Sequence, residues 1–106
     1  MAEPTYRKNL KMSQSFSYRH LYYFWVVAKE GGMARAADRL DMAVQTISAQ
    51  VRELERELGV SLLKPAGRGL ALTEAGQAAL RQADLIFQLG EQMPALVREA
   101  GQSRAT

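Results

Sequence analysis

The sequence predicts a mainly α-helical fold in which three short helices, a small hairpin and one long helix follow each other. Apolar residues recur at helical spacing over residues 18–58, and two short breaks divide that stretch. Residues 61–73 are interrupted by Pro65 and two glycines, which is typical of a tight turn between short strands. Over residues 79–97 the apolar positions keep a four-three rhythm, which indicates a long helix.

The first expected helix covers residues 18–30 and ends at Gly31 and Gly32. One face carries four apolar residues at helical spacing, Leu21, Phe24, Trp25 and Ala28. The other side is apolar as well and consists of Tyr22, Tyr23, Val26 and Val27. Because one core cannot cover both sides of a helix, a second buried contact is expected there.

Two further helices are expected. The shorter one covers residues 33–40, and the longer one follows a break at residues 41–43 and ends at about Leu58. The inward stripe of the shorter one is Met33, Ala36, Ala37 and Leu40. The inward stripe of the longer one is Ile47, Val51, Leu54 and Leu58. Gly59 suits the C-terminal cap of that helix. The outward stripe of the same helix is Gln45, Ala49, Arg52 and Arg56.

A hairpin and a long helix complete the chain. Four leucines flank the Pro and Gly turn, Leu62, Leu63, Leu70 and Leu72. Thr73 followed by Glu74 is typical of an N-cap. The long stripe after it is Ala79, Ala83, Ile86, Gly90, Met93 and Val97, widened by Leu85, Leu89 and Leu96. Such a stripe is typical of a dimerisation helix, in which Gly90 and Pro94 predict a kink or a break.

This order of elements predicts a winged helix-turn-helix followed by a long dimerisation helix. In a winged helix-turn-helix the second helix of the pair enters the DNA major groove, and its first turns here carry Gln45, Thr46 and Ser48. Glutamine pairs bidentately with adenine, and hydroxyl groups donate to or accept from base edges. A polar residue at a helix start is more often a cap or a solvated side chain, so the arginines on the same outward face support the DNA interpretation.

The arginines themselves have two interpretations. Arg52 is expected to hold phosphate, unless the neighbouring glutamates neutralise it. Those glutamates are Glu53, Glu55 and Glu57. Arg35 and Arg39 either contact phosphate or only solvate their helix.

Composition argues against most enzyme chemistry. The chain has no cysteine, so disulfides and thiolate metal sites are excluded, and its single histidine, His20, cannot form a metal cluster or a triad alone. No catalytic residue, metal site, cofactor or small-molecule pocket is therefore expected. The formal charge of +3 and a pI near 9.5 fit an anionic partner. No apolar run is long enough to cross a bilayer, and a cytoplasmic location is expected.

The run "ARAADRLDMAVQTISAQVRELERELGVSLLKPAGRGLALTEAG", residues 34–76, makes a family resemblance specific. It resembles the DNA-binding domain of LysR-type transcriptional regulators in the paired alanines, the LE and LG of the recognition helix, the GRGL wing and the LTEAG entry to the linker helix. Within that family "HLYYFWVVAKEGG", "QTIS" and "GRGL" are most similar to regulators of sodium/proton antiporter genes. The likeness runs from about residue 17 to residue 98.

The chain departs from this family at the recognition helix. Ala43 and Val44 stand where many members have Ser and Gln, so the usual cap is missing and Asp41 is the candidate replacement. Ala49 stands where many members have arginine, which removes a guanine reader. The resemblance also implies that Arg68, between two glycines at the tip of the wing, points toward DNA.

Together these observations predict sequence-specific binding of double-stranded DNA by a homodimer. The expected DNA contacts are Arg35, Gln45, Thr46, Ser48, Ala49, Arg52, Lys64 and Arg68. The expected dimer contacts are Tyr22, Val26, Ala79, Ala83, Ile86, Leu89 and Met93. The alternative is a winged-helix protein-interaction module that dimerises with or binds another regulator, and an enzyme is a distant third.

The expected organisation has four parts. Residues 1–16 form a flexible arm, residues 17–72 the winged helix-turn-helix, residues 73–100 the linker helix and residues 101–106 a disordered tail. Family members usually continue into an effector-binding domain of two α/β lobes, of which no trace follows in these residues. A tetramer is expected only in such a longer form.

Overall fold

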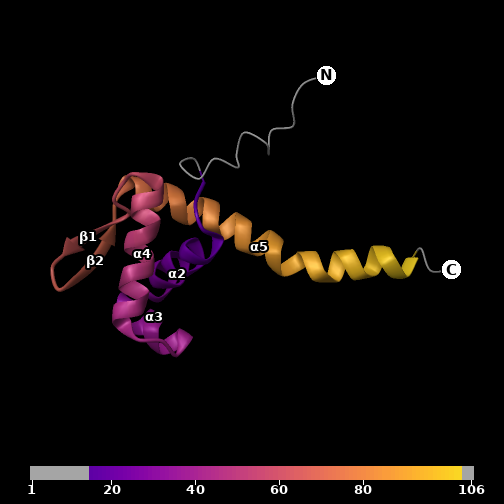
Figure 1. Cartoon of the computed structure of the whole chain (residues 1–106), viewed down its shortest axis with the longest axis horizontal. Coiled ribbons are helices and arrows are strands. Elements are labelled where there is room, and N and C mark those ends of the chain that lie inside the picture. The colour runs from indigo at the N-terminus through magenta and orange to yellow at the C-terminus, as the bar shows by residue number, and fades with distance from the viewer. Residues whose placement is uncertain (1–14, 104–106) are drawn as a thin grey trace, which may run out of the picture.

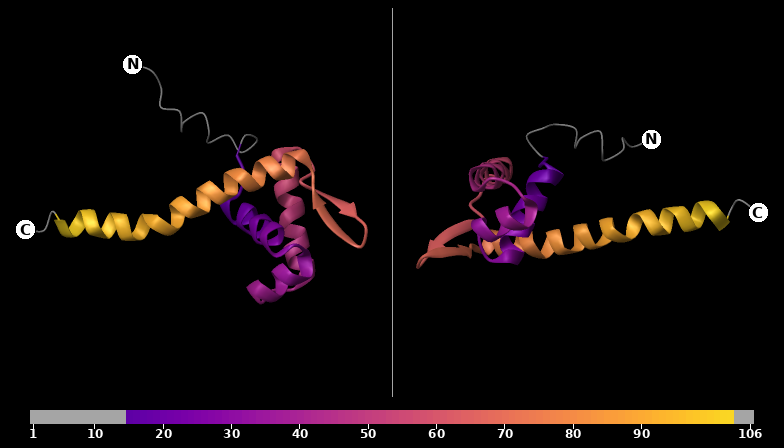
Figure 2. Two further views of the ribbon diagram at one scale, coloured as in Figure 1. Left: turned by 180° about the vertical axis from the view of Figure 1, so that it is seen from behind. Right: turned by 90° about the horizontal axis from the view of Figure 1, so that it is seen from below.

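The structure, a computed structural model, describes residues 15–103. The head consists of α2 (Tyr18–Glu30), α3 (Met33–Leu40), α4 (Val44–Leu58) and a hairpin of β1 (Leu63–Ala66) and β2 (Gly69–Leu72). The long helix α5 (Glu74–Ser103) begins in the head beside the hairpin and leaves it as a rod, so that its C-terminal part extends beyond the other described elements (Figures 1 and 2). This is the expected winged helix-turn-helix with a long C-terminal helix.

The three short helices have the expected bounds, and local caps mark the start of α2 and the ends of α2 and α4. The Ser17 hydroxyl accepts a hydrogen bond from the backbone N–H of His20 at 3.3 Å, which begins α2. Gly31 and Gly59 end α2 and α4 at φ values of 86° and 74°, a left-handed conformation that glycine adopts without strain. Each donates its N–H to the carbonyl four residues earlier.

One apolar core joins the three helices, the start of the hairpin and the first half of α5. Its buried members are Leu21, Phe24, Val26, Val27, Ala36, Ala37, Ile47, Val51, Leu54, Leu62, Ala83 and Phe87. The expected stripe of α4 is confirmed at three positions, but Leu58 is 41% exposed because α4 ends there beyond the core. On α2 both apolar sides have contacts within this chain, with α3, α4 and α5, although Tyr22 and Tyr23 remain half-buried.

The expected hairpin is present, but Pro65 lies in β1, paired with Leu70, and not in the turn. Leu63 pairs with Leu72 and Ala66 with Gly69, which leaves a loop of Gly67 and Arg68 alone. Gly67 has a φ of 58°, the positive value that a two-residue hairpin loop requires at its first position. Arg68 therefore lies at the tip of the wing.

The junction between the wing and α5 is closely packed. Thr73 caps α5, since its hydroxyl accepts from the N–H of Gly76 at 2.9 Å and donates to the carbonyl of Ser61 at 2.7 Å. A Cβ at Gly76 would overlap the carbonyl group of Leu62. Only glycine fits this approach of α5 to the strand entry, and so the glycine of the LTEAG motif has a packing reason.

Helix α5 is held on α2 by aromatic and polar contacts. The ring of Phe87 lies 4.8 Å from Trp25 and 5.4 Å from Tyr22, measured between ring centroids. Asp84 Oδ1 accepts from Trp25 Nε1 at 2.8 Å and pairs with Lys29 Nζ at 2.8 Å. The hydrogen bonds from Lys29 and then Trp25 lower the pKa of Asp84 below its ordinary value.

Of the kink or break expected at Gly90 and Pro94, α5 shows no break: the helix runs through both residues, and its axis changes direction in its second half (Figure 1). Proline removes the hydrogen bond to the carbonyl four residues earlier, here that of Gly90, and a bend of this kind follows from that loss. The helix also ends at Ser103 rather than residue 100. The rest of the expected tail and most of the expected arm lie outside the described residues.

Candidate nucleic-acid interface

The first turns of α4 are exposed. Gln45, Thr46, Ala49 and Arg52 face solvent, and Ser48 is half-buried, because the buried stripe occupies the opposite side of the helix. Ala43 precedes the helix and makes no side-chain capping bond. The expected compensation by Asp41 is wrong, since Asp41 instead ends α3 in a left-handed conformation with its N–H on the carbonyls of Ala37 and Asp38.

The glutamates of α4 do not neutralise Arg52. Glu53 pairs with Arg56, Glu55 accepts from the backbone N–H groups that begin the hairpin, and Glu57 accepts from the N–H of Ser17 and lies 3.2 Å from His20 Nδ1. Among the described residues, Arg52 has its hydrogen bond with Ser48, Nη2 to Oγ at 3.1 Å. The positive charge of Arg52 therefore remains available to a partner, a result that the sequence left open.

The wing and the turn between α2 and α3 share an open cleft. Arg68 and Arg35 both line it, from the tip of the hairpin and from the first turn of α3 respectively. Glycines and apolar side chains make up the rest of the lining, and these residues are Gly31, Gly32, Met33, Ala34, Gly69 and Leu70. Arg39 does not line this cleft, and it forms an ion pair in which its Nε lies 3.1 Å from Glu30 Oε2. Of the two arginines of α3, only Arg35 faces the wing, and the sequence could not separate them.

Lys64 lies on β1 opposite Ala71 and is exposed. The structure thus brings together Ser48 with Arg52 and Arg35 with Arg68, and it leaves the other expected DNA contacts as separate exposed side chains of α4 and the wing. No group of three or more histidine or acidic residues forms a possible metal site in residues 15–103.

From Leu85 onward, α5 carries an exposed apolar stripe. Its side chains are between 55% and 67% exposed and are Leu85, Leu89, Met93, Leu96 and Val97. Two expected dimer contacts require correction, because Val26 and Ala83 are buried in the core of the same chain. Tyr22, Ala79 and Ile86 are half-buried. Phe87 was missed, although its spacing of four residues from Ala83 places both on one face.

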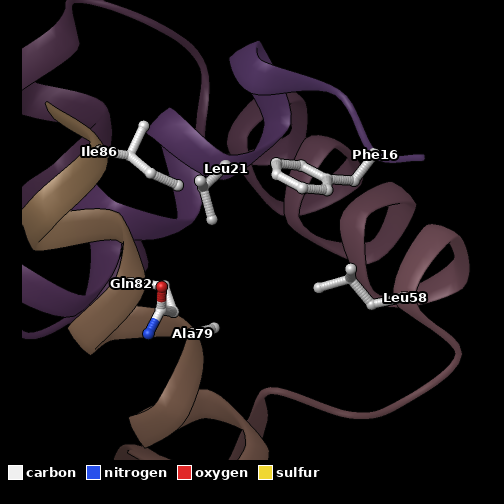
Figure 3. Close-up of a pocket in the computed structure, with 6 residues that line it drawn as sticks. All are labelled: Phe16, Leu21, Leu58, Ala79, Gln82 and Ile86. Carbon is white, nitrogen blue, oxygen red and sulfur yellow. The ribbon is translucent and has the colours of Figure 1, made fainter. Parts of the chain in front are cut away.

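An apolar groove of about 280 Å³ lies where the start of α2, the end of α4 and the first half of α5 meet (Figure 3). Its lining residues are Phe16, Leu21, Leu58, Ala79, Gln82 and Ile86. In Figure 3, Phe16 and Leu58 lie on one side of the opening, and Gln82 and Ala79 on the other. Sequence reasoning assigned Phe16 to the arm and gave no signal of this groove.

A sequence model of bacterial regulatory helix-turn-helix proteins of the LysR family matches residues 18–77, which is more than half of the chain. The chain belongs to the LysR family. The matched region contains α2, α3, α4, the hairpin and the start of α5. The expected family resemblance is thus confirmed.

Similar LysR-family proteins are named as transcriptional regulators. The transcriptional activator protein NhaR of Escherichia coli strain K12 is 47% identical over 83 residues, which are 77% of this chain and 28% of NhaR. The regulator TcbR of Pseudomonas sp. strain P51 is 46% identical over 72 residues, which are 68% of this chain and 24% of TcbR. The chain spans about a quarter of the length of these relatives.

Two solved structures show the same fold with DNA bound. The DNA complex of the CbnR DNA-binding domain has a TM-score of 0.75 and 41% identity, over 81% of this chain and 99% of the CbnR domain. The complex of the BenM DNA-binding domain with catB site 1 DNA has a TM-score of 0.76 and 31% identity, over 81% of this chain and 97% of the BenM domain. None of the described helices is long and apolar enough to span a membrane.

Proposed function

We propose that this chain binds a specific sequence of double-stranded DNA as a homodimer and forms the DNA-binding part of a transcriptional regulator of the LysR type. The observation that carries the proposal is the exposed face of α4, where Gln45, Thr46 and a cationic Arg52 without a carboxylate partner among the described residues lie on one helix. The similarity to two domains that bind DNA supports it.

Gln45 and Thr46 are the proposed base readers. Both lie in the first turn of α4 and are exposed, and the N-terminal end of a recognition helix reaches base edges first. The amide of Gln45 matches the N6 and N7 edge of adenine, and the methyl and hydroxyl groups of Thr46 suit thymine or any hydrogen-bonding edge. Ala49 adds a small apolar surface beside them.

The wing and α3 supply the contacts outside the major groove. Arg68 at the tip of the hairpin is suited to the narrow, strongly negative minor groove of A·T-rich DNA. Arg35 and Lys64 are exposed cations on the flanking elements, and both are proposed to hold phosphate oxygens, which fixes the head on the duplex without reading sequence.

Dimerisation uses the exposed stripe of α5, which includes Leu89 and Met93. A patch of large apolar side chains that are more than half exposed is typical of a surface that a partner covers. A two-fold dimer places two recognition helices to meet the two halves of a palindrome. The proposed dimer surface also includes three half-buried residues where α2 and α5 meet, Tyr22, Ala79 and Ile86.

No enzymatic role, cofactor, metal ion or small-molecule ligand forms part of this proposal. His20, the only histidine, lies beside Glu57 at the junction of α2 and α4. Binding to bacterial DNA implies a cytoplasmic location.

Binding measurements with one variant and its control test the proposal. The Gln45→Ala variant is expected to lower the free-energy difference between specific and non-specific DNA binding by ~1 to 3 kcal/mol, as for a lost base contact. Gln102→Ala removes the same exposed side chain from α5 and is expected to change neither affinity. Binding should weaken steeply with salt, because phosphate contacts release counterions. Binding that is insensitive to salt would instead favour a protein-interaction module.

A further inference from the structure

The side chain of Arg52 points back along α4 toward Ser48. Its Nη2 donates to Ser48 Oγ at 3.1 Å, across one turn of the helix. Helical side chains lean toward the N-terminus, and one turn rises about 5.4 Å. The guanidinium of Arg52 therefore lies level with Ser48, one turn nearer to the end of α4 that carries Gln45 and Thr46.

The guanidinium keeps the donors that a base would need. It has five N–H groups, and the bond to Ser48 uses one hydrogen of Nη2. Whichever hydrogen is used, one edge with two parallel N–H groups stays free. The carboxylates of the same helix do not occupy that edge, because Glu53 pairs with Arg56, and Glu55 and Glu57 bind backbone N–H groups.

Ala49 leaves room beside the guanidinium. Residues 48 and 49 lie four and three positions before Arg52, so both share its face of the helix. Ala49 is exposed and presents only a methyl group. Position 49, where many family members have an arginine, thus has a small side chain in this chain. The guanidinium of Arg52 reaches back over the same turn of α4.

We propose that Arg52 reads a guanine base in the major groove and that Ser48 positions it for this. The inference rests on the proposed function, and it changes the expected role of Arg52 from a phosphate contact to a base contact. Arginine donates two parallel hydrogen bonds to O6 and N7 of guanine, which needs a fixed fork. Ser48 is then a positioning residue, because its hydroxyl holds the arginine instead of reading a base alone.

The test starts from a duplex that the wild-type dimer selects from a random pool, with every single-base-pair variant of one half-site. Arg52→Lys keeps the charge but loses the fork. The expected result is a loss of about tenfold or more in the preference for guanine at one position, with binding to random DNA within about twofold of wild type. Arg56→Lys is the matched control on the same helix, and it should leave every base preference unchanged, because Arg56 pairs with Glu53.

Ser48 variants separate positioning from a merely structural role. Ser48→Ala should weaken the preference for the same guanine and for no other position, and Ser48→Thr, which retains the hydroxyl, should restore it. Full retention of the guanine preference in Arg52→Lys, or an equal loss on all sequences in Arg52→Ala, would overturn the inference while the proposed function stands. A wild-type chain that selects no sequence would overturn the proposed function and this inference together.

Discussion

Single residues decide how α5 joins the head and how the head meets DNA. Gly76 lies where α5 passes the carbonyl of Leu62, and the capping bond from Thr73 fixes that approach. Arg68 lies in a two-residue loop that Gly67 makes possible. At both places, a glycine allows a backbone geometry that positions a neighbouring side chain, Thr73 at the start of α5 and Arg68 at the tip of the wing.

Gly76→Ala should destabilise the protein although alanine is the better helix former. The added Cβ overlaps the Leu62 carbonyl, so the strand entry or α5 must shift, at a cost of ~1–3 kcal/mol in the free energy of unfolding. Denaturant unfolding followed by circular dichroism measures this free energy. Gly101→Ala is the control, because a Cβ there meets no neighbour and should leave the stability unchanged or raise it by up to ~1 kcal/mol. Equal effects of the two substitutions would contradict this packing.

Arg68→Ala should weaken DNA binding most when the sequence beside the selected site is A·T-rich. A guanidinium is favoured in the narrow minor groove of such sequence, and the loss should shrink when the flanks are G·C-rich. Titration of the protein with both duplexes measures the loss of affinity on each. Arg98→Ala, on the exposed surface of α5, is the control for the lost charge. The same loss on both flank types would identify Arg68 as a phosphate contact.

Among the elements, α5 has two roles along its length. Its first half belongs to the head, because Ala83 and Phe87 are part of the core. The exposed stripe starts on the outer side of the helix at Leu85 and continues to Val97. Deletion of the whole helix would therefore expose the core of the head, and single substitutions on the stripe test dimerisation more cleanly.

Leu89→Glu should convert the dimer to monomers without unfolding the head. Leu89 is 67% exposed in the single chain, so its replacement leaves the core intact, while a dimer would bury two glutamates. The dissociation constant of the dimer should rise about 100-fold or more, since each copy loses a buried leucine. Sedimentation equilibrium measures this constant, and Gln88→Glu, an exposed neighbour on α5, is the control. A Leu89→Glu dimer as tight as wild type would place the interface elsewhere.

The contact between α2 and α5 should weaken in acid. The pKa of Asp84 lies below its ordinary value of 3.8, so this carboxylate stabilises the contact above that pH and loses its effect as the pH falls through the lowered pKa. Trp25, the only tryptophan, donates to Asp84, and its fluorescence reports the change. The difference between wild type and Asp84→Asn should appear as a transition below pH 3.8. Superimposable acid titrations would contradict this role.

At the scale of the whole molecule, helix bounds and the order of elements could be predicted from the sequence because local signals determine them. Glycine caps, a threonine cap and apolar spacing are all properties of neighbouring residues. The partners of charged residues could not be predicted, because tertiary packing determines them: the N–H of Ser17 donates to Glu57, 40 residues away, and the N–H of Leu62 donates to Glu55 across the turn after α4. For the same reason, periodicity alone assigned Val26 and Ala83 to a dimer surface, whereas tertiary packing buries both.

Selection of bound duplexes from a random pool tests most directly whether a dimer of these heads reads DNA. Two copies related by a two-fold axis should enrich a single sequence in which the same half-site occurs twice in inverted orientation, with centres about one helical turn apart or a multiple of it. Enrichment should persist at higher salt, where non-specific binding falls away. A pool that shows no enriched sequence, or an enriched site without inverted symmetry, would contradict sequence-specific binding by a symmetric dimer.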